Sequence, residues 1–304
     1  MNKKLAKSRN KRDYSDIIFN VGMYILFTFI CILCFYPFYH LMINTISDNK
    51  LVELGKVIFY PKGIHFANYI SVFKLENLLN ATMVTLARTG LSVVVNVLVT
   101  SYAAYVFTKT IMWKRKFWYR LVVTTMYFSA GLIPGYLNIR MLGLINTFWV
   151  YIIPGMVSVY NMVLVKTFIE SIPESLEESA QLDGAGYLTR FFRIILPLTK
   201  PILATISLFV MVSEWNDFFT TKLYITKPKL NTLQFMLYEY LQQINAAQTQ
   251  LDGVVDDAVS LATQANATTV RLTLTAVVTI PIMCVYPFIQ KYYVKGIMVG
   301  SVKG

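Results

Sequence analysis

Six long apolar runs alternate with charged segments along this chain of 304 residues. A helix needs roughly 20 residues, at about 1.5 Å each, to cross a hydrocarbon core of about 30 Å. The runs that reach or approach this length are Ile17–Ile43, Leu78–Phe107, Phe117–Leu137, Leu142–Val165, Pro201–Thr221 and Leu272–Gln290. Membrane β-strands would instead alternate in polarity over about ten residues. The pattern predicts an all-α integral membrane protein with six transmembrane helices.

The segments between the runs carry a charge pattern that sets the orientation. Six lysines and arginines lie within residues 1–16, four within residues 109–116 and three within residues 291–304. Six crossings put these segments on one side, and an excess of lysine and arginine marks the cytoplasmic side. Both termini are therefore expected in the cytoplasm. The expected parts are tails 1–16 and 291–304, a transmembrane domain 17–290, a cytoplasmic loop 171–200 and an extracellular loop 222–271.

The outer connections differ in length. The first, Asn44–Asn77, has room for a short helix, and the third, near Asn138–Met141, is expected to be a tight turn. The fifth contains a polar, alanine- and glutamine-rich stretch that favours helix. That stretch is either a solvated spacer or a docking surface.

Composition agrees with a membrane protein. Hydrophobic residues make up 56% of the chain and charged residues 14%, and the mean hydropathy is +0.52, whereas soluble domains contain about 25% charged residues. The net charge of +12 lies at the ends of the apolar runs, not on one basic face. This distribution argues against nucleic-acid binding and for a lipid membrane as the surroundings.

The sequence lacks the common signatures of catalysis. It contains no phosphate-binding GxxxxGK[ST] loop, no HExxH and no GxSxG elbow. It has three cysteines and two histidines, and Cys31-x-x-Cys34 stands without a second pair of ligands. We therefore expect no catalytic residue, metal or cofactor on this chain. If its activity consumes ATP, another subunit must bind the nucleotide.

Charges within the apolar runs are few, and two of them are close together. Glu214, Trp215, Asn216 and Asp217 adjoin one another toward the outer end of the fifth run. A carboxylate at the bilayer centre costs about 2.5–3.5 kcal/mol, so such groups face cavities or partners. The cluster indicates either a substrate path or outer gate, or an interfacial helix end anchored by the tryptophan.

The loop after the fourth run contains two expected short helices. Ser171 and Glu174 have the spacing of a capping box, and Pro173 suits a first helical turn. A helix is expected from about Ile172 to Leu182, followed by a turn and a second helix toward Pro197. Such a protruding pair either caps the bundle or docks into a groove of another protein.

The same loop carries a resemblance to a known family. Glu178-x-Ala180, followed by Gly184, Ile194 and Leu196-Pro197, matches the EAA loop of binding-protein-dependent ABC importer permeases, with Ser179 replacing one alanine. Motifs along nearly the whole chain resemble the MalG-type carbohydrate permeases. The C-terminal sequence TIPIMCVYPFIQKYYVKGIMVGSVKG is most similar to lipoprotein-associated oligosaccharide permeases of Gram-positive bacteria.

The resemblance implies a fold, partners and site residues. The fold is the type I ABC importer permease fold, in the plasma membrane of a bacterium. The implied partners are a second, different permease, two ATPase subunits that bind ATP and Mg²⁺, an extracellular sugar-binding lipoprotein and an oligosaccharide. The implied ATPase-coupling residues are Glu174, Glu177, Glu178, Ala180, Asp183, Gly184, Ala185, Leu196 and Pro197.

Two other functions stay open at this stage. A permease for a different solute, such as an amino acid, phosphate or peptide, would share the EAA loop. An ion-coupled secondary transporter would instead show paired charges near the middle of the bilayer and internal repeats. The sequence does not identify the oligosaccharide.

Overall fold

The computed structural model describes residues 14–251, 267–285 and 287, and these residues form helices and loops without a β-strand. They belong to two compact units, Met1–Tyr69 with Asp256–Ala276, and Ile70–Val255 with Val277–Gly304. The all-α expectation is confirmed for the described residues. Both expected tails and the centre of the polar stretch lie largely outside them.

The first unit is dominated by one long apolar helix. Helix α1 (Tyr14–Thr45) exposes most of its large apolar side chains, as a lipid-facing helix does. The connection after it contains α2 (Asn49–Glu53) and the start of α3 (Ala67–Phe73), so two short helices replace the single one expected. This connection is tied to the end of α1, because Asn68 donates from Nδ2 to the carbonyl of Thr45 at 3.1 Å.

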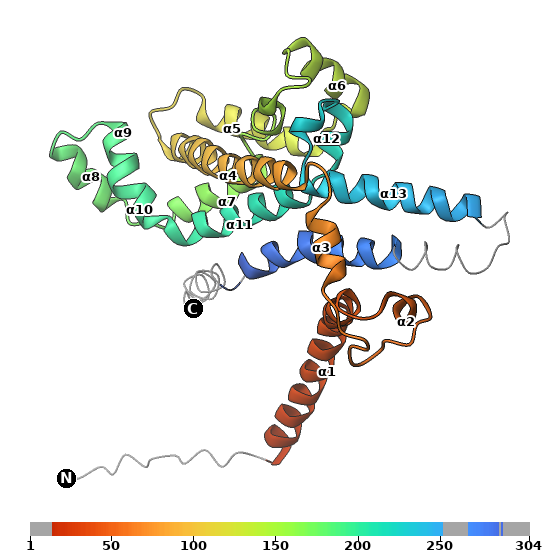
Figure 1. Ribbon diagram of the computed structural model, residues 1–304. Coiled ribbons are helices and arrows are strands. Elements are labelled where there is room, and N and C mark those ends of the chain that lie inside the picture. Colours follow the sequence, from red (N-terminus) through yellow and green to blue (C-terminus); the bar gives the residue numbers. More distant parts are fainter. Residues whose placement is uncertain (1–13, 252–266, 286, 288–304) are drawn as a thin grey trace, which may run out of the picture. The chain divides into compact units, whose positions relative to one another are not determined.

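The second unit is organised around α4 (Leu78–Thr108). This helix contacts α7 (Val159–Ile169), α11 (Lys200–Asn216) and α13 (Leu233–Leu251) (Figure 1). Near the C-terminal end of α4 the shared core is apolar; its buried members are Ala104, Tyr105, Met162, Val165, Ile169, Phe191, Ile195 and Ile206.

The remaining buried face of α4 is polar. Its buried polar side chains recur every three or four residues, the spacing of one helix face: Thr85, Arg88, Thr89, Ser92, Asn96 and Thr100. We call this face the polar stripe. The opposite face exposes leucines and valines, so α4 has a lipid-like outside and a hydrogen-bonding inside.

Three described helices are long and apolar enough to cross a membrane. They are Asp16–Thr45, α4 and Ala267–Val285. A fourth crossing is available if the stretch Tyr187–Leu198 and α11 form one span, although the two meet at 82°. Helix α7 is apolar but has only 11 residues. Thus the first, second and sixth expected runs contain helices of spanning length, and the helix of the last run is described from Ala267.

The third and fourth expected runs are not single helices. Phe117–Leu137 is divided into α5 (Arg115–Thr124), the 3₁₀ turn η1 (Thr125–Tyr127) and α6 (Leu132–Met141). The break falls before Gly131, whose φ of +84° ends regular helix. Apolar length alone overlooked this break.

The fourth run is interrupted in the same way. Leu142–Val165 contains only the short 3₁₀ helix η2 (Phe148–Tyr151) before α7 begins. Gly143 has a φ of +69°, and Pro154 disfavours helix at the residue before it and lacks a backbone N–H. The helix restarts at Ser158, whose Oγ accepts a hydrogen bond from the backbone N–H of Asn161.

Two further expectations are corrected and one is supported. The turn expected near Asn138–Met141 lies just after these residues, because α6 continues to Met141 and the chain turns at Leu142–Gly143, where Gly143 has a φ of +69°. The fifth run ends as α11 at Asn216, and α12 (Phe219–Tyr224) follows as a separate helix. Helix α13 covers the beginning of the polar stretch, in agreement with its helix-favouring composition.

Candidate functional site

The charged cluster at the end of α11 is built around an arginine from α4. Arg88 is 2% exposed and donates from Nε to Oε2 of Glu214 at 2.8 Å. Its Nη2 pairs with Oδ2 of Asp217, and its Nη1 donates to the Asp217 carbonyl at 3.0 Å. The guanidinium carbon lies 4.5 Å from the centre of the Tyr151 ring. Two carboxylates thus share one buried cation.

The four residues expected at the outer gate divide into different roles. Glu214 and Asp217 meet at Arg88, and Asp217 also accepts from the N–H groups of Phe219 and Thr220 at the start of α12. Trp215 is buried and donates from Nε1 to the carbonyl of Val278 at 3.0 Å. Asn216 is exposed and donates to the carbonyl of Val212, on its own helix.

The polar stripe also satisfies the irregular backbone before α7. Asn96 donates from Nδ2 to the Gly155 carbonyl at 2.7 Å, and the N–H of Ser158 donates to Thr100 Oγ1 at 3.3 Å. Neither Arg88 nor Asn96 was singled out as a site residue from the sequence. The spacing of polar residues through Leu78–Phe107 is the signal that could have found both.

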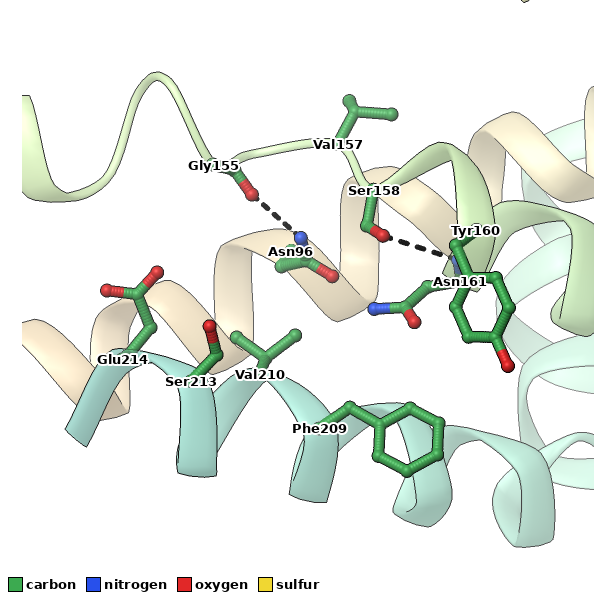
Figure 2. A pocket seen from close by; sticks show the side chains of 10 residues that line it. All are labelled: Asn96, Gly155, Val157, Ser158, Tyr160, Asn161, Phe209, Val210, Ser213 and Glu214. Carbon is green, nitrogen blue, oxygen red and sulfur yellow. Dashed lines mark hydrogen bonds between the residues drawn. The ribbon is translucent and has the colours of Figure 1, made fainter. Parts of the chain in front are cut away.

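A cavity of about 650 Å³ lies beside the polar stripe. It is lined from α4, the segment before α7, α7 and α11 (Figure 2). Figure 2 shows Glu214 and Ser213 at one end of this cavity and the rings of Tyr160 and Phe209 toward the other. A second cavity of about 460 Å³ includes Arg88 and shares Gly155, Ser213 and Glu214 with the first.

The loop with the expected coupling residues forms a short helical pair. Helix α8 (Ser175–Leu182) is followed by a turn, α9 (Tyr187–Arg190), the π-helical η3 (Phe191–Ile195) and α10 (Leu196–Leu198). Figure 1 shows α8 and α9 at one end of α4, away from α12 and α13. The expected helix pair is present, with α8 starting three residues later than expected.

The N-terminal end of α8 differs from its prediction, whereas the turn expected after its C-terminal end is present. The capping box is wrong: Ser171 Oγ donates to the Phe168 carbonyl of α7, and no side chain caps α8. At the other end Gly184 has a φ of +80°. Its N–H donates to Gln181 O at 3.0 Å and the N–H of Ala185 to Ala180 O at 2.9 Å, which is a Schellman motif.

The expected coupling residues do not all face outward. Glu177 points into the unit, where its Oε1 accepts from the hydroxyl of Tyr105 at 2.6 Å and its Oε2 pairs with Lys109. Arg190 lies 3.5 Å from Glu177 Oε1 and donates to Gln181 Oε1 at 2.8 Å. We call Glu177 with Tyr105, Lys109 and Arg190 the Glu177 cluster.

The exposed part of the helical pair is acidic and apolar. Leu182 is 90% exposed, and Leu176, Tyr187 and Phe192 are also exposed. Of the coupling residues predicted from sequence, the exposed ones are Glu174, Glu178, Asp183, Gly184 and Pro197, and the half-buried ones are Ala180, Ala185 and Leu196. Phe191, in the same loop, is buried against Tyr105 with ring centres 5.5 Å apart.

Comparison with known proteins defines the class of this chain. Residues 66–299 match the family described as "Binding-protein-dependent transport system inner membrane component". The match covers more than half of the chain. It includes Arg88 with Glu214 and Asp217, here called the Arg88 cluster, and the loop 171–200. The chain belongs to this family, and the resemblance seen in the EAA loop is confirmed.

Individual relatives make the comparison more specific. The polygalacturonan/rhamnogalacturonan transport system permease protein YtcP of Bacillus subtilis (strain 168) is 34% identical over 283 residues, covering 93% of this chain and 96% of the relative. Protein LplC of the same organism is 33% identical, covering 88% and 89%. A crystal structure of a bacterial ABC transporter that imports the acidic polysaccharide alginate matches with a TM-score of 0.79 and 28% identity, covering 92% and 98%.

Replacing Arg88 by methionine should destabilise the protein strongly. The change leaves Glu214 and Asp217 without a cation, and removing one partner of a buried pair costs about 3–5 kcal/mol. We expect a lower midpoint of thermal unfolding for the purified protein, whereas Arg140→Met, at an exposed position of α6, should unfold like wild type. The triple variant that also carries Glu214→Gln and Asp217→Asn has no unpaired charge at this site, so its midpoint of thermal unfolding should return most of the way to that of wild type. An unchanged midpoint in the single variant would contradict this account.

Replacing Glu177 by glutamine tests the inward contact. The amide keeps the shape of the side chain but removes the charge that faces Lys109 and Arg190. We therefore expect the free energy of unfolding to fall by about 3 kcal/mol. Limited proteolysis should then cut the α8–α9 turn faster. Glu170→Gln, which removes an exposed pair with Lys166, is the control and should change little. Equal cleavage of both variants would mean that Glu177 does not hold α8 to α4.

Proposed function

We propose that this chain is a transmembrane permease subunit of an ATP-driven ABC importer for oligosaccharides or polysaccharide fragments. The observation that carries the proposal is similarity over nearly the whole chain to a polygalacturonan/rhamnogalacturonan permease and to a transporter that imports alginate. On this view the chain has no enzymatic activity of its own. ATP and Mg²⁺ bind to two separate ATPase subunits.

The proposed topology has six crossings and two cytoplasmic termini. The basic segments at residues 1–16, 109–116 and 291–304 support it by the positive-inside rule. The third and fourth crossings are broken helices. The irregular backbone of the fourth is hydrogen-bonded to α4, and such backbone is tolerated at membrane depth where protein covers it. The coupling loop 171–200 is then cytoplasmic, and loop 222–271 faces the exterior of a bacterial, Gram-positive plasma membrane.

The helical pair α8–α9 is the proposed contact with an ATPase subunit. Its exposed carboxylates and apolar side chains suit a groove in another protein, and its cytoplasmic place follows from the topology above. Tightening of the ATPase pair around ATP would displace α8, and the Glu177 cluster would carry that displacement to α4. A small contact can then bias a bundle that has two stable arrangements.

The remaining partners complete the transport path. A second, different permease would face this one, and an extracellular sugar-binding lipoprotein would deliver the oligosaccharide. The Arg88 cluster lies at the other end of α4 from the coupling loop, where the topology places the exterior. We assign Glu214 and Asp217 to the outer gate through their shared contact with Arg88.

Transport by the reconstituted complex tests the function. Liposomes that contain both permeases and the ATPases should take up sugar only with ATP and the binding protein, and collapse of ion gradients should not stop uptake. Uptake driven by an ion gradient without ATP would overturn the proposal. A ligand screen of the binding protein that yields only amino acids, phosphate or peptides would reject the carbohydrate assignment.

Gly184→Val should uncouple this complex. A β-branched residue at a φ of +80° strains the backbone by about 1–2 kcal/mol. A Cβ at Gly184 meets nothing within 4 Å of this chain, so its side chain would project toward the ATPase. We expect normal membrane insertion, weaker ATPase binding in a pull-down and at least tenfold slower uptake. Thr189→Val, at an exposed position of α9, is the control. Normal uptake by Gly184→Val would mean that the loop only caps the helix bundle and does not couple it to the ATPase.

Labelling of single cysteines tests the orientation. The background for this test is a variant without Cys31, Cys34 and Cys284. In it, a cysteine that replaces Ile64 should react with an impermeant maleimide on intact cells, because Ile64 lies in the first connection, which is expected outside the cell. A cysteine at Thr189 should react only after the cells are opened. The reverse pattern would overturn the topology.

A further inference from the structure

The cavity beside the polar stripe is lined by a polar side chain that makes no hydrogen bond within the described residues. Asn161 is 4% exposed, and its carboxamide lines the cavity of about 650 Å³. Its backbone N–H donates to Ser158 Oγ, but no hydrogen bond to its carboxamide occurs among the described residues. Buried amides normally have partners. An unpaired one in a cavity of ligand-site size, about 300–1,000 Å³, indicates a ligand.

The other side chains that line the cavity suit a pyranose ring. Tyr160 and Phe209 supply aromatic faces, on which the C–H face of a sugar packs. Ser213 and Asn161 supply hydroxyl and amide groups, which both donate and accept hydrogen bonds. Figure 2 shows these groups arranged along one cavity, with the aromatic rings at the end away from Glu214.

The charge of the residues that line the cavity favours a sugar without a carboxylate. Glu214 is the one formally charged residue among the ten that line the cavity, and it is an acid. Arg88, its partner, does not line this cavity and already faces two carboxylates. A uronate carboxylate in the cavity would therefore meet a like charge and lose its water without gaining a cation.

We propose that this cavity is a binding subsite for an uncharged pyranose unit of the transported oligosaccharide and that it discriminates against uronates. The proposal rests on the proposed function and goes beyond it, because the relative YtcP and the alginate transporter are named for acidic polysaccharides. Asn161 is the residue assigned to hydrogen-bond the sugar hydroxyls. Tyr160 and Phe209 position the ring.

Two matched trisaccharides test the subsite. α-1,4-Galactotriose and α-1,4-trigalacturonate differ only in a hydroxymethyl or carboxylate group on each ring. Binding of each to the full complex without the binding protein is measured by saturation-transfer NMR. Galactotriose should bind at least tenfold tighter than trigalacturonate. Asn161→Leu should weaken galactotriose binding at least tenfold, and Asn138→Leu, the same change at an exposed site on α6, should not.

The outcomes separate the subsite from the proposed function. Equal or tighter binding of trigalacturonate, no binding of either sugar, or full galactotriose binding by Asn161→Leu would each overturn the subsite. ATP- and binding-protein-dependent uptake by the same preparation reports the permease function independently. Tyr160→Leu provides a second test: if it folds and keeps wild-type galactotriose affinity, the stacking role is excluded and the subsite fails with it.

Discussion

Hydrogen bonds from one face of α4 support backbone that has no helix of its own. Water is absent from the hydrocarbon core, and an unpaired backbone polar group there costs several kcal/mol. The segment between η2 and α7 escapes this cost because Ser92, Asn96 and Thr100 reach Tyr151, Gly155 and Ser158. The break in the fourth apolar run, and the cavity beside it, therefore depend on the polar stripe. A wholly apolar α4 would have left these backbone groups without these hydrogen-bond partners.

The same helix connects the two candidate sites. Arg88 and Tyr105 are 17 positions apart on α4, which at about 1.5 Å per residue is about 26 Å along the helix axis. At Arg88, α4 provides the cation that Glu214 and Asp217 share. At Tyr105, α4 contacts Glu177 and so belongs to the Glu177 cluster. Because both groups of charges are bonded to the same helix, a displacement of α8 would be passed along α4 toward the Arg88 cluster. The apolar core around Phe191 fixes α4 to the coupling loop in the same way.

The sequence predicted those features that depend on local chemistry. Apolar length predicted α1 and α4, and the turn expected after the first short helix of the loop is present, with Gly184 at a φ of +80°. Apolar length failed where Gly131 and Pro154 break the helix inside otherwise apolar runs. The capping box failed because Ser171 found a nearer acceptor at the end of α7. Pairings such as Arg88 with Glu214, 126 positions apart, depend on how helices pack, which spacing within one segment does not specify.

The structure changes the interpretation of Glu214 and Asp217, because it shows that both pair with Arg88. Considered from the sequence, Glu214 and Asp217 were costly charges that indicated either a substrate path or outer gate, or an interfacial helix end. In the structure their cost is offset by Arg88, whose Nε and both terminal nitrogens are already bound to these two residues. Three of the five N–H groups of Arg88 are used in this way, and the two carboxylates exceed its single positive charge, so an acidic sugar would gain little from this cation. The charged groups therefore hold α4 to the end of α11. On the proposed function, recognition of the sugar would fall to the uncharged side chains next to them, among which the Asn161 carboxamide makes no hydrogen bond within the described residues.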